Sequence, residues 1–190
     1  MTEWTAVVLA GGRGRRLGGV DKAAIEVDGR SLLDMVLGSI PEQVPVVVVG
    51  PTHPTPRAVT FTLEEPRYGG PVAAVAAALG SVSTPLIGLL AVDMPRSPEL
   101  IAWIDPRSLG ADVDAVVCVD GDGRTQPMGA VYRVSALTQA IERLGDPAGQ
   151  SMRGLLALLR VETRRLADAA GELTRDIDEP EDLDRLARGD

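Results

Sequence analysis

The sequence predicts an α/β fold in three layers, with a mostly parallel central sheet and helices on both of its faces. Three observations support this prediction. Short runs of apolar, β-branched residues are each bounded by Gly, Pro or Asp, as is typical of buried strands. Segments with helical spacing separate these runs, and the two kinds of segment alternate along the chain. Parallel strands need a crossover connection, which is usually a helix, so the alternation favours a parallel sheet covered on both sides.

The expected strands are short and end at residues that interrupt regular structure. The first of them precedes a glycine-rich stretch, and a later one contains the single cysteine of the chain. In chain order the expected strands span residues 5–10, 46–50, 59–63, 86–91, 115–119 and 129–133.

The expected helices lie between and after these runs. Several begin with a serine that can cap the first turn, or with a proline at the first helical position. They span residues 31–40, 71–79, 97–104 and 135–144, and two further helices are expected near residues 151–160 and 180–188.

Length and composition favour a single domain over residues 1–190. With 45% hydrophobic residues, the chain can bury a substantial core without disulfides or structural metals. The one cysteine, Cys118, lies in an apolar run, and there is no Cys/His cluster of the kind that binds zinc. Neither a membrane-spanning stretch nor a signal-peptide pattern is present, so we expect a cytoplasmic protein that does not bind membranes.

The net charge of −8 argues against a general nucleic-acid surface, because such binding depends on cations that neutralise phosphates. Arg13, Arg15, Arg16 and Lys22 nevertheless crowd into one short stretch. This concentration of positive charge in an acidic chain predicts a local site for a small anion.

Residues 9–22 form a glycine- and arginine-rich loop directly after the first expected strand. Its glycines allow the backbone N–H groups to approach a ligand closely, and its cationic side chains suit a polyphosphate. The spacing fits neither a Walker loop nor a dinucleotide fingerprint, because Leu17 stands where the latter needs glycine and no Gly-Lys-Ser/Thr occurs. The residues expected to bind a nucleotide are Leu9, Ala10, Gly11, Gly12, Arg13, Gly14, Arg16 and Lys22.

The same loop resembles the L-A-G-G-x-x-x-R-M/L-G signature, closed by D-K, of molybdenum cofactor guanylyltransferases and related nucleotidyltransferases. The resemblance implies a Rossmann-like three-layer αβα fold. It also implies that Gly11 and Gly12 run alongside the base and ribose, that Arg16 grips the β- and γ-phosphates, and that Lys22 contacts the α-phosphate. Arg16 and Lys22 are therefore expected to be catalytic, together with Asp93.

Asp93 follows the strand expected at residues 86–91, at the edge where α/β sheets bind ligands. A carboxylate there suits Mg²⁺, which takes one or two carboxylates and completes its shell with phosphates and water. The resemblance implies that Asp178, in an ending similar to D-x-N/D-T-P-E-D-L, completes the metal site. The alternatives are that Asp93 only caps the turn before Pro95, and that Asp178 only complements the N-terminus of the last helix.

The resemblance implies that an acidic residue ahead of a Gly-Pro helix start recognises the base. Glu64 and Glu65 precede Gly70 here, and we assign Glu65 and Gly70 to the nucleotide, with Glu64 as the alternative by one position of register. A carboxylate can accept both guanine donors, N1–H and N2–H₂. Gly11 favours guanine, because cytidine-specific relatives carry Leu-Ala-Ala-Gly, whereas Gly50 replaces the asparagine that guanine-specific relatives often have.

The acceptor side is assigned to Gln126 and Arg153, in segments that resemble those lining a pterin phosphate. A solvated arginine is the alternative for Arg153. His53 lies in a proline-rich loop and is expected to have no role.

The resemblance thus implies transfer of GMP from GTP to molybdopterin, with pyrophosphate released and Mg²⁺ as cofactor. Other proteins of molybdenum cofactor biosynthesis, or the enzymes that receive the cofactor, are the implied partners. A monomer is assumed. Three alternatives stay open: a cytidylyltransferase or a transferase for a sugar phosphate or phospholactate, a non-catalytic nucleotide-binding module, and a dinucleotide-dependent oxidoreductase.

Overall fold

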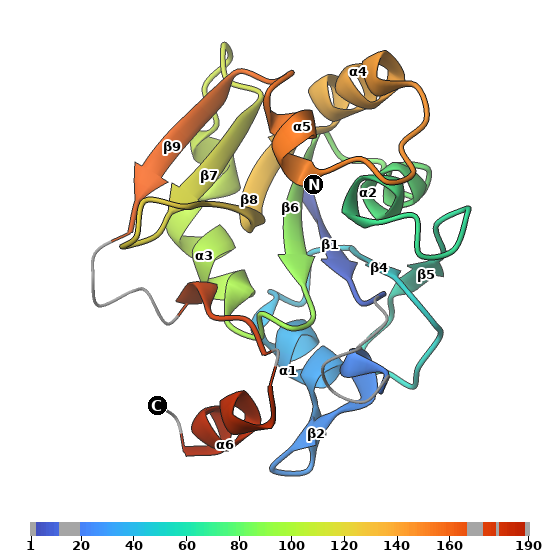
Figure 1. Cartoon of the computed structure of the whole chain (residues 1–190), viewed down its shortest axis with the longest axis vertical. Coiled ribbons are helices and arrows are strands. Elements are labelled where there is room, and N and C mark those ends of the chain that lie inside the picture. Colours follow the sequence, from blue (N-terminus) through green and yellow to red (C-terminus); the bar gives the residue numbers. More distant parts are fainter. Residues whose placement is uncertain (1–2, 12–19, 167–172, 178, 189–190) are drawn as a thin grey trace.

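The computed structural model describes residues 3–11, 20–166, 173–177 and 179–188 (Figure 1). It confirms the predicted three-layer α/β fold. The central sheet has seven strands in the order β5-β4-β1-β6-β8-β7-β9. Every neighbouring pair is parallel except the two pairs made by β8.

The parallel half of the sheet carries the first part of the chain. β1 (Trp4–Leu9) lies between β4 (Val46–Val49) and β6 (Leu86–Ala91), and β5 (Thr60–Thr62) is the edge strand beyond β4. All four match runs that the sequence predicts as strands.

The other half of the sheet differs from the prediction in two ways. β8 spans Thr125–Arg133, so the expected run at residues 129–133 is only its second half, and it is antiparallel to β6 and to β7 (Ala115–Val119). β9 (Val161–Arg165) was not expected, because its sequence has three charged residues and no apolar run. It is an edge strand, where such residues are common.

Helices cover both faces of the sheet (Figure 1). One face carries α1 and α3, and the other carries α2, α4 and α5. Helix α5 is shorter than expected, because β9 begins within a few residues of its end. The bounds are α1 Leu32–Ser39, α2 Pro71–Leu79, α3 Ser97–Ile104, α4 Val134–Leu144, α5 Met152–Leu156 and α6 Pro180–Arg188.

The core lies on both sides of the sheet, which explains the continuous apolar runs of the central strands. In β1, Ala6 and Val8 pack under α1 and α3, whereas Val7 and Leu9 pack under α2 and its neighbours. A short hairpin, β2 (Glu26–Val27) with β3 (Arg30–Ser31), precedes α1. No helix in the described ranges is long and apolar enough to cross a membrane.

Candidate active site

The candidate site lies where the carboxyl ends of β1, β4 and β6 meet (Figure 1). The strand register aligns Leu9 with both Val49 and Ala91. Just past the strand, the Ala10 N–H donates to the Val49 carbonyl at 2.9 Å, and the Val92 N–H donates to the Leu9 carbonyl at 3.0 Å. Leu9 and Ala10 are buried, at 9% and 3% exposure. They therefore fix the start of the loop through packing and main-chain bonds.

Gly50 allows β4 to end very close to this loop. A Cβ at Gly50 would lie 3.0 Å from the Ala10 carbonyl carbon and 3.2 Å from the Gly11 nitrogen. Such distances are shorter than a side chain tolerates without displacing its neighbours. A side chain at position 50, such as the asparagine that the resemblance leads us to expect, would therefore press on the start of the loop.

Glu64 is the carboxylate that lies against the loop. It is 8% exposed, and its Oε1 would be 3.7 Å from a Cβ placed on Gly11. The same Oε1 accepts a 3.0 Å hydrogen bond from the Tyr68 N–H, which fixes its position. Glu65, the residue assigned to the nucleotide from the sequence, is exposed. The structure therefore places Glu64, the alternative by one position of register, against Gly11 and leaves Glu65 in solvent.

Gly70 precedes α2 at its N-cap position and has a φ of +93°, a conformation that favours glycine. Pro71 follows at the first helical position. Next to Gly70, the Gly69 carbonyl accepts a 2.7 Å hydrogen bond from the Gly149 N–H. This bond brings the segment before α5 to the start of α2. Arg153, the predicted acceptor-binding residue in α5, is exposed.

Lys22 and Asp93 meet at the centre of the site. The Lys22 ammonium donates to Asp93 Oδ2 and to the Ile177 carbonyl, both at 2.9 Å. The Ile177 N–H in turn donates to the Asp93 carbonyl at 2.8 Å. Three segments that are far apart in the sequence, the end of the signature loop, the end of β6 and the approach to α6, therefore converge on one charge pair.

Asp21 and His53 form a second polar contact beside Lys22, which sequence reasoning missed. His53 Nε2 lies 3.0 Å from Asp21 Oδ2 without forming a hydrogen bond to it, and Asp21 Oδ1 accepts a hydrogen bond from the Ala23 N–H. The contact joins the proline-rich loop after β4 to the end of the signature loop. A lone histidine in a loop carries no sequence signal for such a pairing, because the two residues are far apart along the chain.

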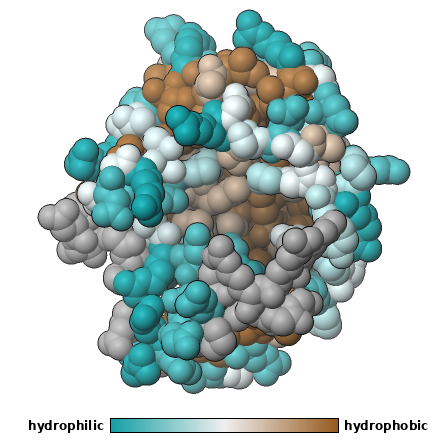
Figure 2. All heavy atoms as spheres, viewed as in Figure 1, coloured by the Kyte–Doolittle hydropathy of each residue, from teal (hydrophilic) through white to brown (hydrophobic). Residues whose placement is uncertain are grey.

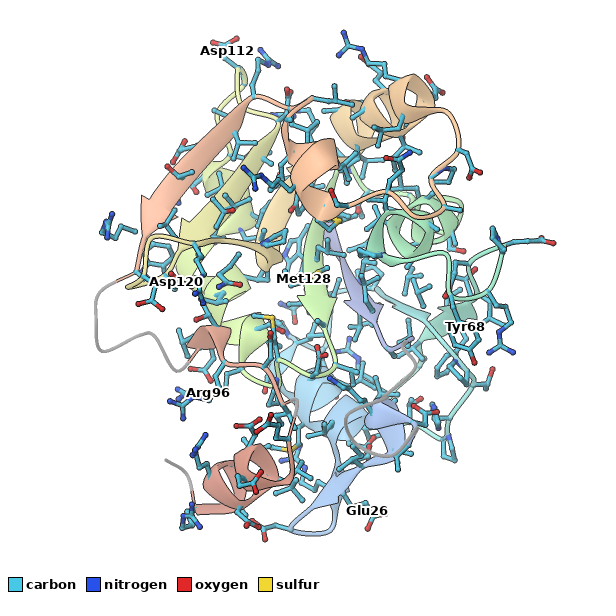
Figure 3. The ribbon with its side chains drawn as sticks, viewed as in Figure 1. Glu26, Tyr68, Arg96, Asp112, Asp120 and Met128 are labelled. Atoms are coloured by element: carbon cyan, nitrogen blue, oxygen red, sulfur yellow. The ribbon has the colours of Figure 1, made fainter. Side chains whose placement is uncertain are left out.

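Gln126, the other predicted acceptor-binding residue, donates from its side-chain amide to Asp120 Oδ2 at 2.8 Å. Hydrogen bonds from the Arg124 N–H and from Gln126 hold the pKa of the Asp120 carboxyl below its usual range. In the view of Figure 1, the surface has a hollow with an apolar floor near its middle (Figure 2). Met128 of β8 lies in the same place in the matching view of Figure 3. Gln126 lies on the same strand and is fixed by its carboxylate partner rather than free to rotate.

Five of the predicted site residues lie outside the described part of the chain: Gly12, Arg13, Gly14, Arg16 and Asp178. Within the described ranges, there is no cluster of three or more His, Cys, Asp or Glu that could hold a metal ion.

Comparison with known proteins gives consistent results. Residues 6–169 match the family described as the MobA-like NTP transferase domain. A protein of Acidiphilium cryptum named molybdenum cofactor guanylyltransferase is 34% identical over 97% of this chain and 94% of its own length.

Solved structures share the fold at lower identity. The molybdopterin-guanine dinucleotide biosynthesis protein A of Archaeoglobus fulgidus superposes with a TM-score of 0.71 at 22% identity, over 97% of both chains. A 2-C-methyl-D-erythritol 4-phosphate cytidylyltransferase of Thermus thermophilus gives a TM-score of 0.68 at 24% identity, over 98% of this chain and 100% of its own. The architecture is thus common to enzymes named for different bases and acceptors.

Proposed function

Because the chain belongs to the family of MobA-like NTP transferases, we propose that it transfers GMP from GTP to the phosphate of molybdopterin and releases pyrophosphate. Membership makes the protein a nucleotidyltransferase. The observation that carries the finer proposal is the Lys22–Asp93 pair at the carboxyl edge of the sheet, on the same edge as the exposed Gly11, which the carboxylate of Glu64 borders. The name of the Acidiphilium relative supports GTP and molybdopterin as the substrates.

Guanine is the base that the site's carboxylate suits. Glu64 Oε1 already accepts one backbone hydrogen bond, and a carboxylate has further lone pairs for two donors. Guanine presents N1–H and N2–H₂ side by side, whereas cytosine presents only one amino donor on its pairing edge. We therefore assign base recognition to Glu64 and keep Gly11 and Gly70 as the backbone positions that border the nucleotide.

The oxygens around Lys22 fit a magnesium ion. Asp93 Oδ2 and the Ile177 carbonyl already surround one cation, the Lys22 ammonium, and both are hard oxygen donors of the kind that Mg²⁺ prefers. We propose that Asp93 and Asp178 hold Mg²⁺, which would neutralise phosphate charge during transfer.

We propose that the cationic side chains assist the transfer of the nucleotide itself. An oxygen of the acceptor phosphate attacks the α-phosphorus, the bond from that phosphorus to the bridging oxygen breaks, and pyrophosphate leaves with the electron pair. Lys22 and Arg16 would stabilise the charge that develops on the α-phosphate and the leaving group. Gln126 and Arg153 are proposed to orient the acceptor. No nucleophilic side chain is needed, because the acceptor phosphate is itself the nucleophile.

The proposal is tested by measuring pyrophosphate release with molybdopterin and each of GTP, CTP, ATP and UTP. We expect turnover with GTP, and we expect Asp93→Asn to lower kcat by roughly 10²–10³, as for loss of a preorganised electrostatic contact. Preference for CTP would reassign the base. Tight GTP binding without pyrophosphate release, with molybdopterin or any other phosphorylated acceptor, would instead indicate a non-catalytic nucleotide-binding module.

We place this reaction in the cytoplasm, with the product passed to other proteins of cofactor biosynthesis or to the enzymes that use the cofactor. Cys118 is buried and forms no disulfide, which suits a reducing compartment. Burial raises the pKa of its thiol to about 11, so we expect it to stay protonated and unreactive.

A further inference from the structure

Lys22 is the only lysine in the chain, and all the other Lys/Arg positions are arginines. The difference matters at this position. An ammonium is a compact charge with donors in several directions, whereas a guanidinium is a planar fork. A single ammonium nitrogen can contact two oxygens at once, as a metal ion does.

The geometry around Lys22 is that of a bound cation. Its Nζ lies 2.9 Å from both Asp93 Oδ2 and the Ile177 carbonyl oxygen, and the side chain is 16% exposed. The backbone bond from Ile177 to Asp93 keeps these two oxygens in a fixed relation. The oxygen that the metal would use is therefore already taken by an internal cation.

We propose that Lys22 holds the cation position at Asp93 while no nucleotide is bound, and leaves it for the phosphates when metal and triphosphate enter together. This exchange rests on the function proposed above. Asp93 would hold the metal ion through the same carboxylate that now holds Lys22, and two cations on one carboxylate repel each other. Lys22 can leave at little cost only if new oxygens accept its ammonium, and the triphosphate supplies them.

The exchange predicts weak binding of a free divalent ion, because displacing the ammonium would break its bonds to Asp93 and Ile177 with no phosphate present to replace them. Binding of free Mn²⁺, without nucleotide, can be followed by electron paramagnetic resonance. We expect Lys22→Met to bind Mn²⁺ at least about tenfold more tightly than the wild type, since a partly buried Asp93 carboxylate is then left without its counter-charge. The double variant Lys22→Met/Asp93→Asn should lose this gain.

Arg96→Met is the matched control for the loss of one positive charge near Asp93. Arg96 is bound to Glu99 at 2.9 and 3.0 Å and lies away from the centre of the molecule in Figure 3. This variant should bind Mn²⁺ as the wild type does. Equal Mn²⁺ affinity for the wild type and Lys22→Met, or an equal gain in Arg96→Met, would overturn the exchange.

A second measurement follows Lys22 itself. Protein labelled with ¹³C-lysine gives one Cε–Hε cross-peak from the folded chain, because there is one lysine. Mg²⁺ alone should leave this peak in place, whereas Mg²⁺ with a non-hydrolysable GTP analogue should shift it. A shift with Mg²⁺ alone at the same concentration would overturn the exchange. A protein that gains Mn²⁺ affinity in Lys22→Met yet binds no GTP would contradict the proposed function but not the occupied cation position.

Discussion

At the residue scale, two acidic side chains define the two ends of the proposed nucleotide. Glu64 lies against Gly11 at the base end, and Asp93 holds Lys22 at the phosphate end. Both follow directly after strands of the parallel half of the sheet, β5 and β6, so their backbone is fixed by the ladder. Their partners differ: Glu64 accepts from a backbone N–H, whereas Asp93 accepts from the ammonium of a lysine side chain.

Glu64→Gln should selectively weaken GTP use. The glutamine oxygen can still accept from the Tyr68 N–H, so the local turn is kept, but its amide group presents donors to the guanine donors. Loss of a charged hydrogen bond of this kind costs about 1.5–3 kcal/mol, which corresponds to a fall in kcat/KM for GTP of roughly 10–100-fold. Steady-state pyrophosphate release over a range of GTP concentrations measures it.

Glu65→Gln is the control for this substitution, because the exposed neighbour loses the same charge. It should leave kcat/KM within about twofold of the wild type, as expected for a solvated side chain. An equal effect of the two substitutions, or a larger effect of Glu65→Gln, would return base recognition to the position first assigned from the sequence.

At the scale of elements, the path of β8 beneath α3 depends on one glycine, Gly129, whose backbone conformation is not that of a regular strand. Gly129 has a φ of +69°, and a Cβ there would collide with Leu100 Cδ1 of α3. It lies next to the place where the register between β7 and β8 shifts. The glycine therefore allows α3 to pack on a strand that bends, which explains why the strand continues on both sides of it.

Gly129→Ala should destabilise the protein by at least about 2 kcal/mol, because left-handed strain and overpacking add. Gly123→Ala separates the two effects, since Gly123 has a φ of +81° but open space around its Cβ position. Strain alone should cost it about 1–2 kcal/mol. Urea unfolding of both variants gives the comparison, and equal losses would show that Leu100 yields without cost.

Besides the ladder between β7 and β9, a charge pair links the residues that directly precede the two strands, Asp114 and Arg160. Asp114 accepts three hydrogen bonds from Arg160, from the backbone N–H and from the guanidinium, at 2.8–3.0 Å. The side-chain bonds from Arg160 hold the pKa of the Asp114 carboxyl below its usual range. The ionised form thus stabilises the folded state above the unfolded pKa of about 3.9, and this contribution is lost as the pH falls through the lowered value.

Asp114→Asn should therefore reduce stability at pH 7 but make it less sensitive to acid. Urea midpoints measured between pH 7 and pH 3 should fall less in the variant than in the wild type, and the two curves should converge at the acid end. Asp112→Asn is a control, because Asp112 is fully exposed and its contact with Arg160 is long, at 4.0 Å. Its stability curve should follow that of the wild type. Parallel curves for the wild type and Asp114→Asn would show that the pair does not contribute.

At the scale of the whole molecule, the sequence predicted most of the parallel half of the sheet well, because β1, β4 and β6 are buried on both faces. Val46–Val49 and Leu86–Ala91 are buried throughout, so apolar runs identify them. β9 escaped prediction because an edge strand buries little, and its residues are held by ladder bonds to β7 rather than by their own hydrophobicity.

The site could be predicted only in part, as was the case for the sheet. Lys22 and Asp93 follow strands whose carboxyl ends meet, and the structure brings them together. The choice between Glu64 and Glu65 depends on which side chain the turn at Tyr68 buries, and the contact of His53 with Asp21 depends on where a loop folds back. Both are tertiary outcomes without a local signal. The roles of all these residues stay predictions.

The C-terminal segment supplies one of the two oxygens that contact Lys22. Truncations of the chain test whether the site needs this segment. Ile177 is 3% exposed, packs against the core under α1 and α3, and gives its carbonyl to Lys22. A chain that stops after Leu166 keeps β9 but loses this contact and the candidate ligand Asp178. We expect it to fold with a melting temperature lower by about 5–10 °C, from the lost burial of apolar side chains. Its turnover should fall by at least roughly 100-fold.

A chain that stops after Glu179 separates the site contacts from the last helix. It keeps Ile177 and Asp178 but lacks α6, whose Leu183 and Leu186 only pack at the margin of the same core. Because the oxygens around Lys22 are retained, this shorter deletion should keep most of its pyrophosphate release while melting somewhat earlier. Circular dichroism melts and GTP turnover of the two truncations distinguish these effects. Equal loss of turnover in both would mean that α6 itself, rather than the approach to it, closes the site.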